Sequence, residues 1–210
     1  WRIPKDEVVD GGPGKDGIPS IDDPRFISVD QVDFLEDNDL VLGIKVDSEI
    51  KAYPYPILDW HEIVNDEVGS SKVAITYCPL TGTGIGWNRT LNNKTTTFGV
   101  SGLLYNSNLI PYDRETDSYW SQMLLESVNG PMKGREVSTY QVIETSWKTW
   151  KEMYPGSKIL STNTGYNRNY DRYPYGDYRS SPGILFPVNP RDNRLFEKER
   201  VLGIISSDEA

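Results

Sequence analysis

The chain has few of the side chains that bind soft metals or act as nucleophiles near neutral pH. Its 210 residues include one His and one Cys, which are His61 and Cys78. A single Cys excludes an internal disulfide and a two-cysteine redox cycle. The pair also excludes a zinc site made of Cys and His alone, and it lacks the second His that a blue-copper site normally uses.

Long apolar segments and an excess of positive charge are also absent. No run of about 18 apolar residues occurs, so we expect no transmembrane helix and no membrane insertion. The formal net charge is −9 and the pI is about 4.7, which disfavours nucleic acid and anionic membrane surfaces as partners. The chain begins at Trp1 with no signal peptide, which is typical of a processed product and compatible with export.

The composition is that of a polar but folded chain. Hydrophobic residues make up 37%, and 13 Tyr, 6 Trp and 5 Phe supply rigid apolar surface. A chain of this length forms a core without disulfides. We predict one globular α+β domain over residues 26–205, mostly antiparallel sheet with a few short helices and long loops. An irregular arm, residues 1–25, precedes it, and an acidic tail, residues 206–210, follows it.

Apolar, β-branched segments predict the strands. Two such segments flank Asp47 and Ser48, so we expect a hairpin of strands Leu40–Val46 and Glu49–Tyr53. Lys72–Cys78 has the composition of a buried strand that runs into a proline.

The helices and the last strand are predicted from caps, periodicity and composition. Pro56 suits the start of a short helix, Ile57–Val64. Thr145–Tyr154 is the clearest helix, with Thr145 as its N-cap and Trp and Tyr side chains on one face. Arg194–Ile205 has the pattern of a final strand or strand pair.

Two segments lack a pattern for regular structure. The Gly-, Pro- and Asp-rich arm either wraps the domain or stays mobile. Residues 163–183 form a long loop rich in Tyr and Arg, and such loops suit sugars, carboxylates or a protein partner, or pack their own aromatics onto the domain. The candidate binding surface on this loop is Tyr170, Arg172, Tyr173, Tyr175 and Arg179.

Several segments together resemble a known family. They include Gly11–Pro19, His61–Asp66, Thr76–Gly82, Val100–Asn108 and Ser118–Gln122. Over nearly its whole length the chain is similar to a bacterial and archaeal family of unknown function, DUF 3179. Members of that family are typically exported, so the resemblance implies an extracytoplasmic protein, whether secreted, periplasmic or at the cell surface. It implies no established activity, but it implies that the segments around His61 and Cys78 are family features.

The interpretation we prefer for His61 and Cys78 is a mononuclear metal site. Thiolate and imidazole together suit copper, and Cu(I) accepts few, soft ligands. Met123 is the best third ligand, and the α-amino group of Trp1 or the carboxylate of Glu62 is a further candidate. We therefore predict a copper-type site that serves metal handling or electron transfer.

Two alternatives to copper stay open. A Cys next to a His can form a thiolate–imidazolium pair, which would make Cys78 and His61 the catalytic residues of a hydrolase or transferase. Asn65, Asp66 or Asn106 would then orient the imidazole. The other alternative is a non-catalytic extracellular assembly or binding module whose His and Cys are structural.

The remaining expectations concern the surface. Asn88–Thr90 and Asn93–Thr95 match the N-glycosylation pattern, so Asn88 and Asn93 are glycosylation candidates. As protein partners we expect a second copy of the chain, in a homo-oligomer, or another extracellular protein.

Overall fold

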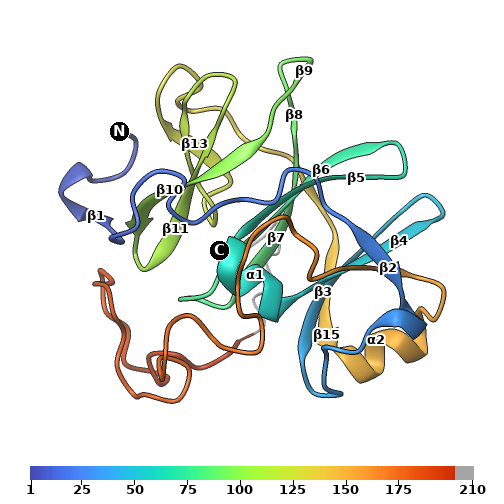
Figure 1. Ribbon diagram of the computed structural model, residues 1–210. Helices are drawn as coiled ribbons and strands as arrows, with labels where there is room; N and C mark the ends of the chain where they lie inside the picture. The colour runs from blue at the N-terminus through green and yellow to red at the C-terminus, as the bar shows by residue number, and fades with distance from the viewer. Residues whose placement is uncertain (202–210) are drawn as a thin grey trace.

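The computed structural model describes residues 1–201 and consists mostly of antiparallel sheet (Figure 1). Two short α-helices, α1 (Tyr55–His61) and α2 (Trp147–Met153), accompany three main sheets and one small strand pair, β8 (Thr90–Leu91) with β9 (Lys94–Thr95). The strand-rich α+β fold class predicted from the sequence is therefore confirmed. At seven residues each, neither helix is long enough to cross a membrane, and the rest of the described chain offers no longer one.

The first sheet contains the predicted hairpin, which is confirmed. Val41 pairs with Pro54 at its open end, and Asp47 adopts a φ of 54° in the turn. Strand β16 (Lys158–Leu160) runs parallel to its neighbour β4 (Glu49–Pro54), whereas the other pairs are antiparallel. The strand order is β15 (Val142–Ser146), β3 (Leu40–Val46), β4 (Glu49–Pro54), β16 (Lys158–Leu160) and β2 (Phe26–Ser28).

Helix α2 packs on this sheet through a close contact between a glycine and a tryptophan. A Cβ atom added to Gly43 of β3 would overlap the ring of Trp150, so only glycine leaves room for that ring. The predicted helix is confirmed, but its predicted N-cap is wrong. The cap is Ser146, the last residue of β15, whose hydroxyl accepts from the Thr149 amide, because the helix begins at Trp147.

The second sheet confirms the strand predicted at Lys72–Cys78. Its central strand is buried from Val73 onward, as its continuous apolar sequence indicates. The strand order is β14 (Thr139–Tyr140), β7 (Thr83–Asn88), β6 (Ser71–Cys78) and β5 (Ile63–Val68).

The third sheet contains a bulge that accommodates the arm. The pairing of its second and third strands shifts between Val100 and Leu103, and Gly102 has a φ of 79° there. A Cβ atom on Gly102 would lie 2.8 Å from the Gly14 backbone, so glycine permits the close approach. The strand order is β1 (Val8–Asp10), β10 (Phe98–Tyr105), β11 (Asn108–Asp113), β12 (Tyr119–Ser121) and β13 (Glu126–Asn129).

The arm wraps the domain and is more regular than predicted. It forms a 3-10 helix, Lys5–Glu7, and the edge strand β1, and a second 3-10 helix, Val29–Gln31, follows it. The amide of Ile21 donates to the Ile63 carbonyl at 2.9 Å. The Arg114 guanidinium also pairs with two arm carboxylates, those of Asp16 and Asp22, each at 3.2 Å.

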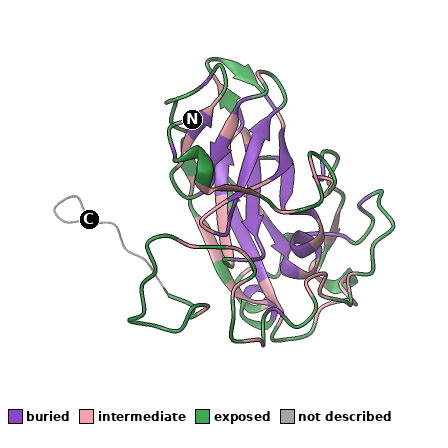
Figure 2. Cartoon of the chain, turned by 90° about the vertical axis from the view of Figure 1, so that its left-hand side faces the viewer, coloured by how far each residue is buried: buried purple, intermediate pink, exposed green. Residues whose placement is uncertain are grey.

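The core runs along the strands, as Figure 2 shows by its continuous buried ribbons. Aromatic rings fill it where the second and third sheets meet. The rings of Trp87 and Phe98 lie 5.2 Å apart, and that of Trp120 lies 5.9 Å from Phe98. Large aromatics thus supply core volume in a chain with few aliphatic residues.

The C-terminal part of the described chain has no regular elements. Residues 163–183 form turns and bends, as predicted for this loop. The strand predicted at Arg194–Ile205 is wrong as far as residue 201, where turns and bends occur and Phe196 is 87% exposed. The remainder of that segment and the predicted acidic tail lie outside the described residues.

Candidate functional site

His61 is the last residue of α1 and is fully buried. Its Nδ1 donates to the Pro19 carbonyl at 2.7 Å, so its Nε2 accepts from the Tyr170 hydroxyl at 2.8 Å. The Tyr170 hydroxyl lies 2.6 Å from the Thr164 hydroxyl. Burial lowers the pKa of His61 to about 4, and the positive charge of Arg168 acts in the same direction. The imidazole is therefore neutral at pH 7, and its two hydrogen bonds connect the arm to residues 163–183, the Tyr-rich loop.

Cys78 lies at the end of β6 and has a different hydrogen-bond partner. It is 1% exposed, and its thiol donates to the Ser107 carbonyl over 3.6 Å. Burial, with the negative charge of Glu62, raises the pKa of the thiol. In this arrangement the thiol stays protonated and does not pair with His61. Nucleophilic chemistry at Cys78 stays a prediction.

The polar residues predicted to orient the imidazole serve other contacts. Pro19 and Tyr170 hold the ring instead, and both lie far from His61 in the sequence. The side chain of Asn65 binds the Phe98 backbone, Asp66 pairs with Lys51, and Asn106 binds the Asn189 backbone.

The three predicted copper ligands differ in their surroundings. Met123 is 60% exposed on the turn between β12 and β13, whereas His61 and Cys78 are buried. Across residues 1–201, no three His, Cys, Asp or Glu side chains are grouped so as to hold a metal ion. Because Nε2 of His61 is bound to Tyr170, a metal at that nitrogen requires the tyrosine to move. Copper binding stays a prediction.

The Tyr-rich loop turns most of its predicted binding residues toward the domain. Tyr170, Tyr173 and Tyr175 are half-buried, whereas Arg172 and Arg179 are exposed, so a binding role for this surface stays a prediction. Tyr173 lies 3.5 Å from the Pro79 carbonyl, Tyr175 donates to Glu62 at 2.9 Å, Arg179 stacks over the Tyr173 ring at 4.0 Å, and the Arg172 carbonyl accepts from the Trp60 indole at 3.0 Å.

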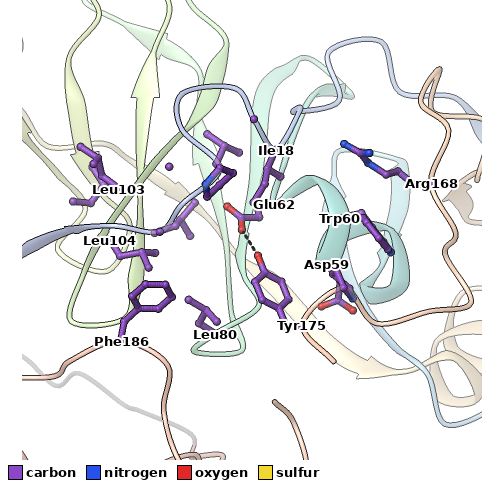
Figure 3. A pocket seen from close by; sticks show the side chains of 18 residues that line it. Ile18, Asp59, Trp60, Glu62, Leu80, Leu103, Leu104, Arg168, Tyr175 and Phe186 are labelled. Atoms are coloured by element: carbon purple, nitrogen blue, oxygen red, sulfur yellow. Dashed lines mark hydrogen bonds between the residues drawn. The ribbon is translucent and has the colours of Figure 1, made fainter. Parts of the chain in front are cut away.

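A cavity of about 320 Å³ lies where three segments distant in the sequence meet (Figure 3). The arm, the β10–β11 hairpin, and the end of α1 with the Tyr-rich loop form its walls. Aliphatic and aromatic side chains predominate in the lining, which is typical of small-molecule sites. They include Ile18 from the arm, Leu103 and Leu104 from β10, Leu80, and Phe186 from the segment after the loop.

Glu62 is a buried acid in the lining of this cavity. It follows the last residue of α1 with φ 57° and ψ −33°, a strained conformation for a residue with a side chain. The helix therefore ends at His61, before the predicted end at Val64. The side chain is held by Tyr175, whose hydroxyl donates to Oε1 at 2.9 Å, and the residue is 7% exposed. Burial raises the pKa of Glu62 to about 7; Asp59 adds to this rise and the Tyr175 hydrogen bond opposes it.

The other ionisable groups around the cavity already have partners. Burial raises the pKa of Asp59 to about 7, although Arg179 donates to both of its oxygens, at 2.7 and 2.8 Å, and opposes the rise. The Arg168 guanidinium lies over the Trp60 ring, 5.6 Å from its centroid, and Figure 3 shows it beside Trp60 and away from Glu62. Glu62 therefore remains the carboxyl group of the lining that no cation in residues 1–201 neutralises.

The two glycosylation candidates lie in different settings. Asn88 is half-buried, and its side-chain oxygen accepts from the Thr90 amide at 2.8 Å. Asn93 is exposed in the β8–β9 turn. Glycosylation at both positions stays a prediction.

Sequence reasoning identified part of this cavity and missed its centre. Tyr175 was among the predicted binding residues, and Glu62 among the candidate metal ligands, yet no pattern connected the two. A positive φ at a glutamate has no signature in the sequence, and neither does the meeting of the arm with the β10–β11 hairpin. The nearest signal was the placement of Glu62 beside His61 at the end of a predicted helix.

Comparison with curated proteins and with solved structures finds no match to this chain. A family model described as "Protein of unknown function (DUF3179)" matches residues 15–210. The match includes the ends of α1 and β6, the β10–β11 hairpin and the Tyr-rich loop, which carry most of the cavity lining. The chain therefore belongs to the DUF3179 family.

Proposed function

We propose that this protein is an extracytoplasmic domain that binds a small, largely apolar molecule in the cavity beside α1. The observation that carries the proposal is a cavity of about 320 Å³ with mostly apolar walls and one buried carboxyl group, that of Glu62. Small-molecule sites typically combine roughly 300–1,000 Å³ of apolar space with a few polar groups that orient the ligand. The extracytoplasmic location rests on the resemblance to exported proteins.

Hydrogen bonds join the walls of the cavity to one another, which favours a preformed site. His61 joins the arm to the Tyr-rich loop through Pro19 and Tyr170. The amide of Gly11 donates to the Gly102 carbonyl at 2.7 Å, which fixes the arm on β10. A preformed site loses little conformational entropy when a ligand binds, and that improves affinity.

A neutral, apolar fluorescent probe, N-phenyl-1-naphthylamine, tests the proposal. We expect saturable binding with enhanced emission, weakened by about tenfold or more in Leu104→Trp, because the larger ring fills the cavity. Leu124→Trp is the matched control, since Leu124 is 52% exposed and does not line the cavity. Circular dichroism checks that both variants fold. Absent probe binding, or equal binding by both variants, contradicts the proposal.

Copper binding remains a separate prediction with its own measurement. Metal analysis and absorption spectra of the purified protein are compared with those of Cys78→Ser and His61→Ala. Copper that both substitutions remove supports the metal site. Copper content that neither substitution changes refutes it.

A further inference from the structure

Glu62 is a buried acid that has no positively charged partner within residues 1–201. It is 7% exposed, yet no Lys or Arg of the described chain forms an ion pair with it. Oε1 accepts from Tyr175, whereas Oε2 has no hydrogen-bond donor within residues 1–201 and is not sealed off from the cavity. A buried carboxylate without a cation is costly, so the site favours a ligand that supplies the positive charge.

The other charges near the cavity leave this position free. Arg179 is held by Asp59 through two hydrogen bonds. The Arg168 guanidinium lies over the Trp60 ring, 5.6 Å from its centroid, and Figure 3 shows it away from Glu62. Neither arginine therefore neutralises the carboxyl group.

The surroundings of Glu62 suit an organic cation better than a hydrated metal ion. The rings of Tyr175, Phe186 and Trp60 line the cavity with it. Aromatic faces attract ammonium groups, and apolar walls accommodate the hydrocarbon part of an amine. The net charge of −9 also attracts cations toward the molecule.

We propose that the ligand is a small organic amine whose ammonium group donates to Glu62 while its apolar body packs among Leu103, Leu104 and Phe186. This inference rests on the small-molecule function proposed above and specifies its ligand class. Glu62 is then the residue that determines specificity for positive charge. Its conformation at the end of α1 and the Tyr175 hydrogen bond keep the carboxylate in place before the ligand arrives.

Three probes that share one apolar body and differ in charge test this proposal. They are 2-phenylethylammonium, the neutral 2-phenylethanol and the anionic 3-phenylpropanoate, each used to displace N-phenyl-1-naphthylamine. We expect the ammonium to bind about tenfold tighter than the alcohol, and the anion weakest of the three. In Glu62→Gln, which keeps the shape of the side chain, the ammonium should lose its advantage over the alcohol.

The outcomes separate this inference from the proposed function. If the dye binds but ammonium and alcohol compete equally with the wild-type protein, the amine inference is overturned and the small-molecule function stands. If no dye binds to the wild-type protein, both fall. Should Glu62→Gln fail to fold, Tyr175→Phe keeps the ring but removes the donor to the carboxylate. That variant should weaken ammonium binding relative to alcohol binding near pH 7, and an unchanged ratio overturns the inference.

Discussion

Acidification should destabilise the protein through His61, and His61→Gln should remove that loss. In the folded protein both ring nitrogens are engaged, one donating to Pro19 and one accepting from Tyr170. A proton added to Nε2 requires the Tyr170 hydroxyl to turn from donor to acceptor and places a charge in a fully buried side chain. Glutamine can donate and accept in the same way but does not titrate.

The magnitude follows from the two pKa values. The pKa of His61 is about 4 in the folded protein, against an ordinary value of 6.5, so the unfolded chain binds more protons between these values. Stability from this group is therefore complete above about pH 6.5 and is lost as the pH falls toward 4. Linkage gives a loss of about 2 kcal/mol between about pH 7 and pH 4.5.

The assay is urea unfolding followed by tryptophan fluorescence at both pH values. Glu62 and Asp59 have raised pKa values, so they stabilise the fold as the pH falls, but both proteins contain them and their contribution cancels. His61 is the sole His, so no other imidazole contributes. The wild-type protein should lose about 2 kcal/mol more than His61→Gln. An equal loss in the two proteins refutes a neutral, buried imidazole.

Three further predictions concern other parts of the fold. Cys78 should resist a water-soluble thiol reagent until denaturant is added, because it is 1% exposed, and rapid labelling of the native protein contradicts this. Lys51→Met should lower the free energy of unfolding in urea by roughly 3–5 kcal/mol, because it leaves the Asp66 carboxylate buried without its ion-pair partner at 2.9 Å. Adding Asp66→Leu to that variant should recover stability, and no recovery contradicts the prediction. Gly43→Ala should lower the free energy of unfolding by roughly 1–3 kcal/mol, because the added Cβ atom overlaps the buried Trp150 ring, whereas Gly156→Ala adds its Cβ atom into open space and should not. Equal melting temperatures of the two variants contradict the contact between Gly43 and Trp150.

Local patterns predicted the elements whose stability comes from nearby residues. The hairpin of β3 and β4 was predictable because its turn and both apolar strands are contiguous. Helix α2 was predictable from its periodic aromatics, although its cap lies one residue later than predicted, because β15 continues to Ser146 and the helix begins at Trp147. The strand predicted from Arg194 failed as far as residue 201, because apolar residues without a neighbouring strand do not form sheet.

The candidate site depended on contacts that no local pattern contains. His61 binds Pro19 and Tyr170, which are 42 and 109 positions away, so its neutral, structural setting was invisible in its own segment. Glu62 became a cavity residue because α1 ends there with a positive φ and Tyr175 reaches it from 113 positions along the chain.

The amino-acid sequence by itself determined the strand-rich α+β class, the hairpin, helix α2 and the membership of a family. It also determined that one His and one Cys, His61 and Cys78, limit the metal and thiol chemistry available. Periodicity and composition act over a few residues, and they suffice for such conclusions. Only the tertiary structure decided that these two residues bind separate partners, and that no cation within residues 1–201 neutralises Glu62 in the cavity. Burial and charge balance depend on which distant segments meet, and that is a property of the folded chain alone.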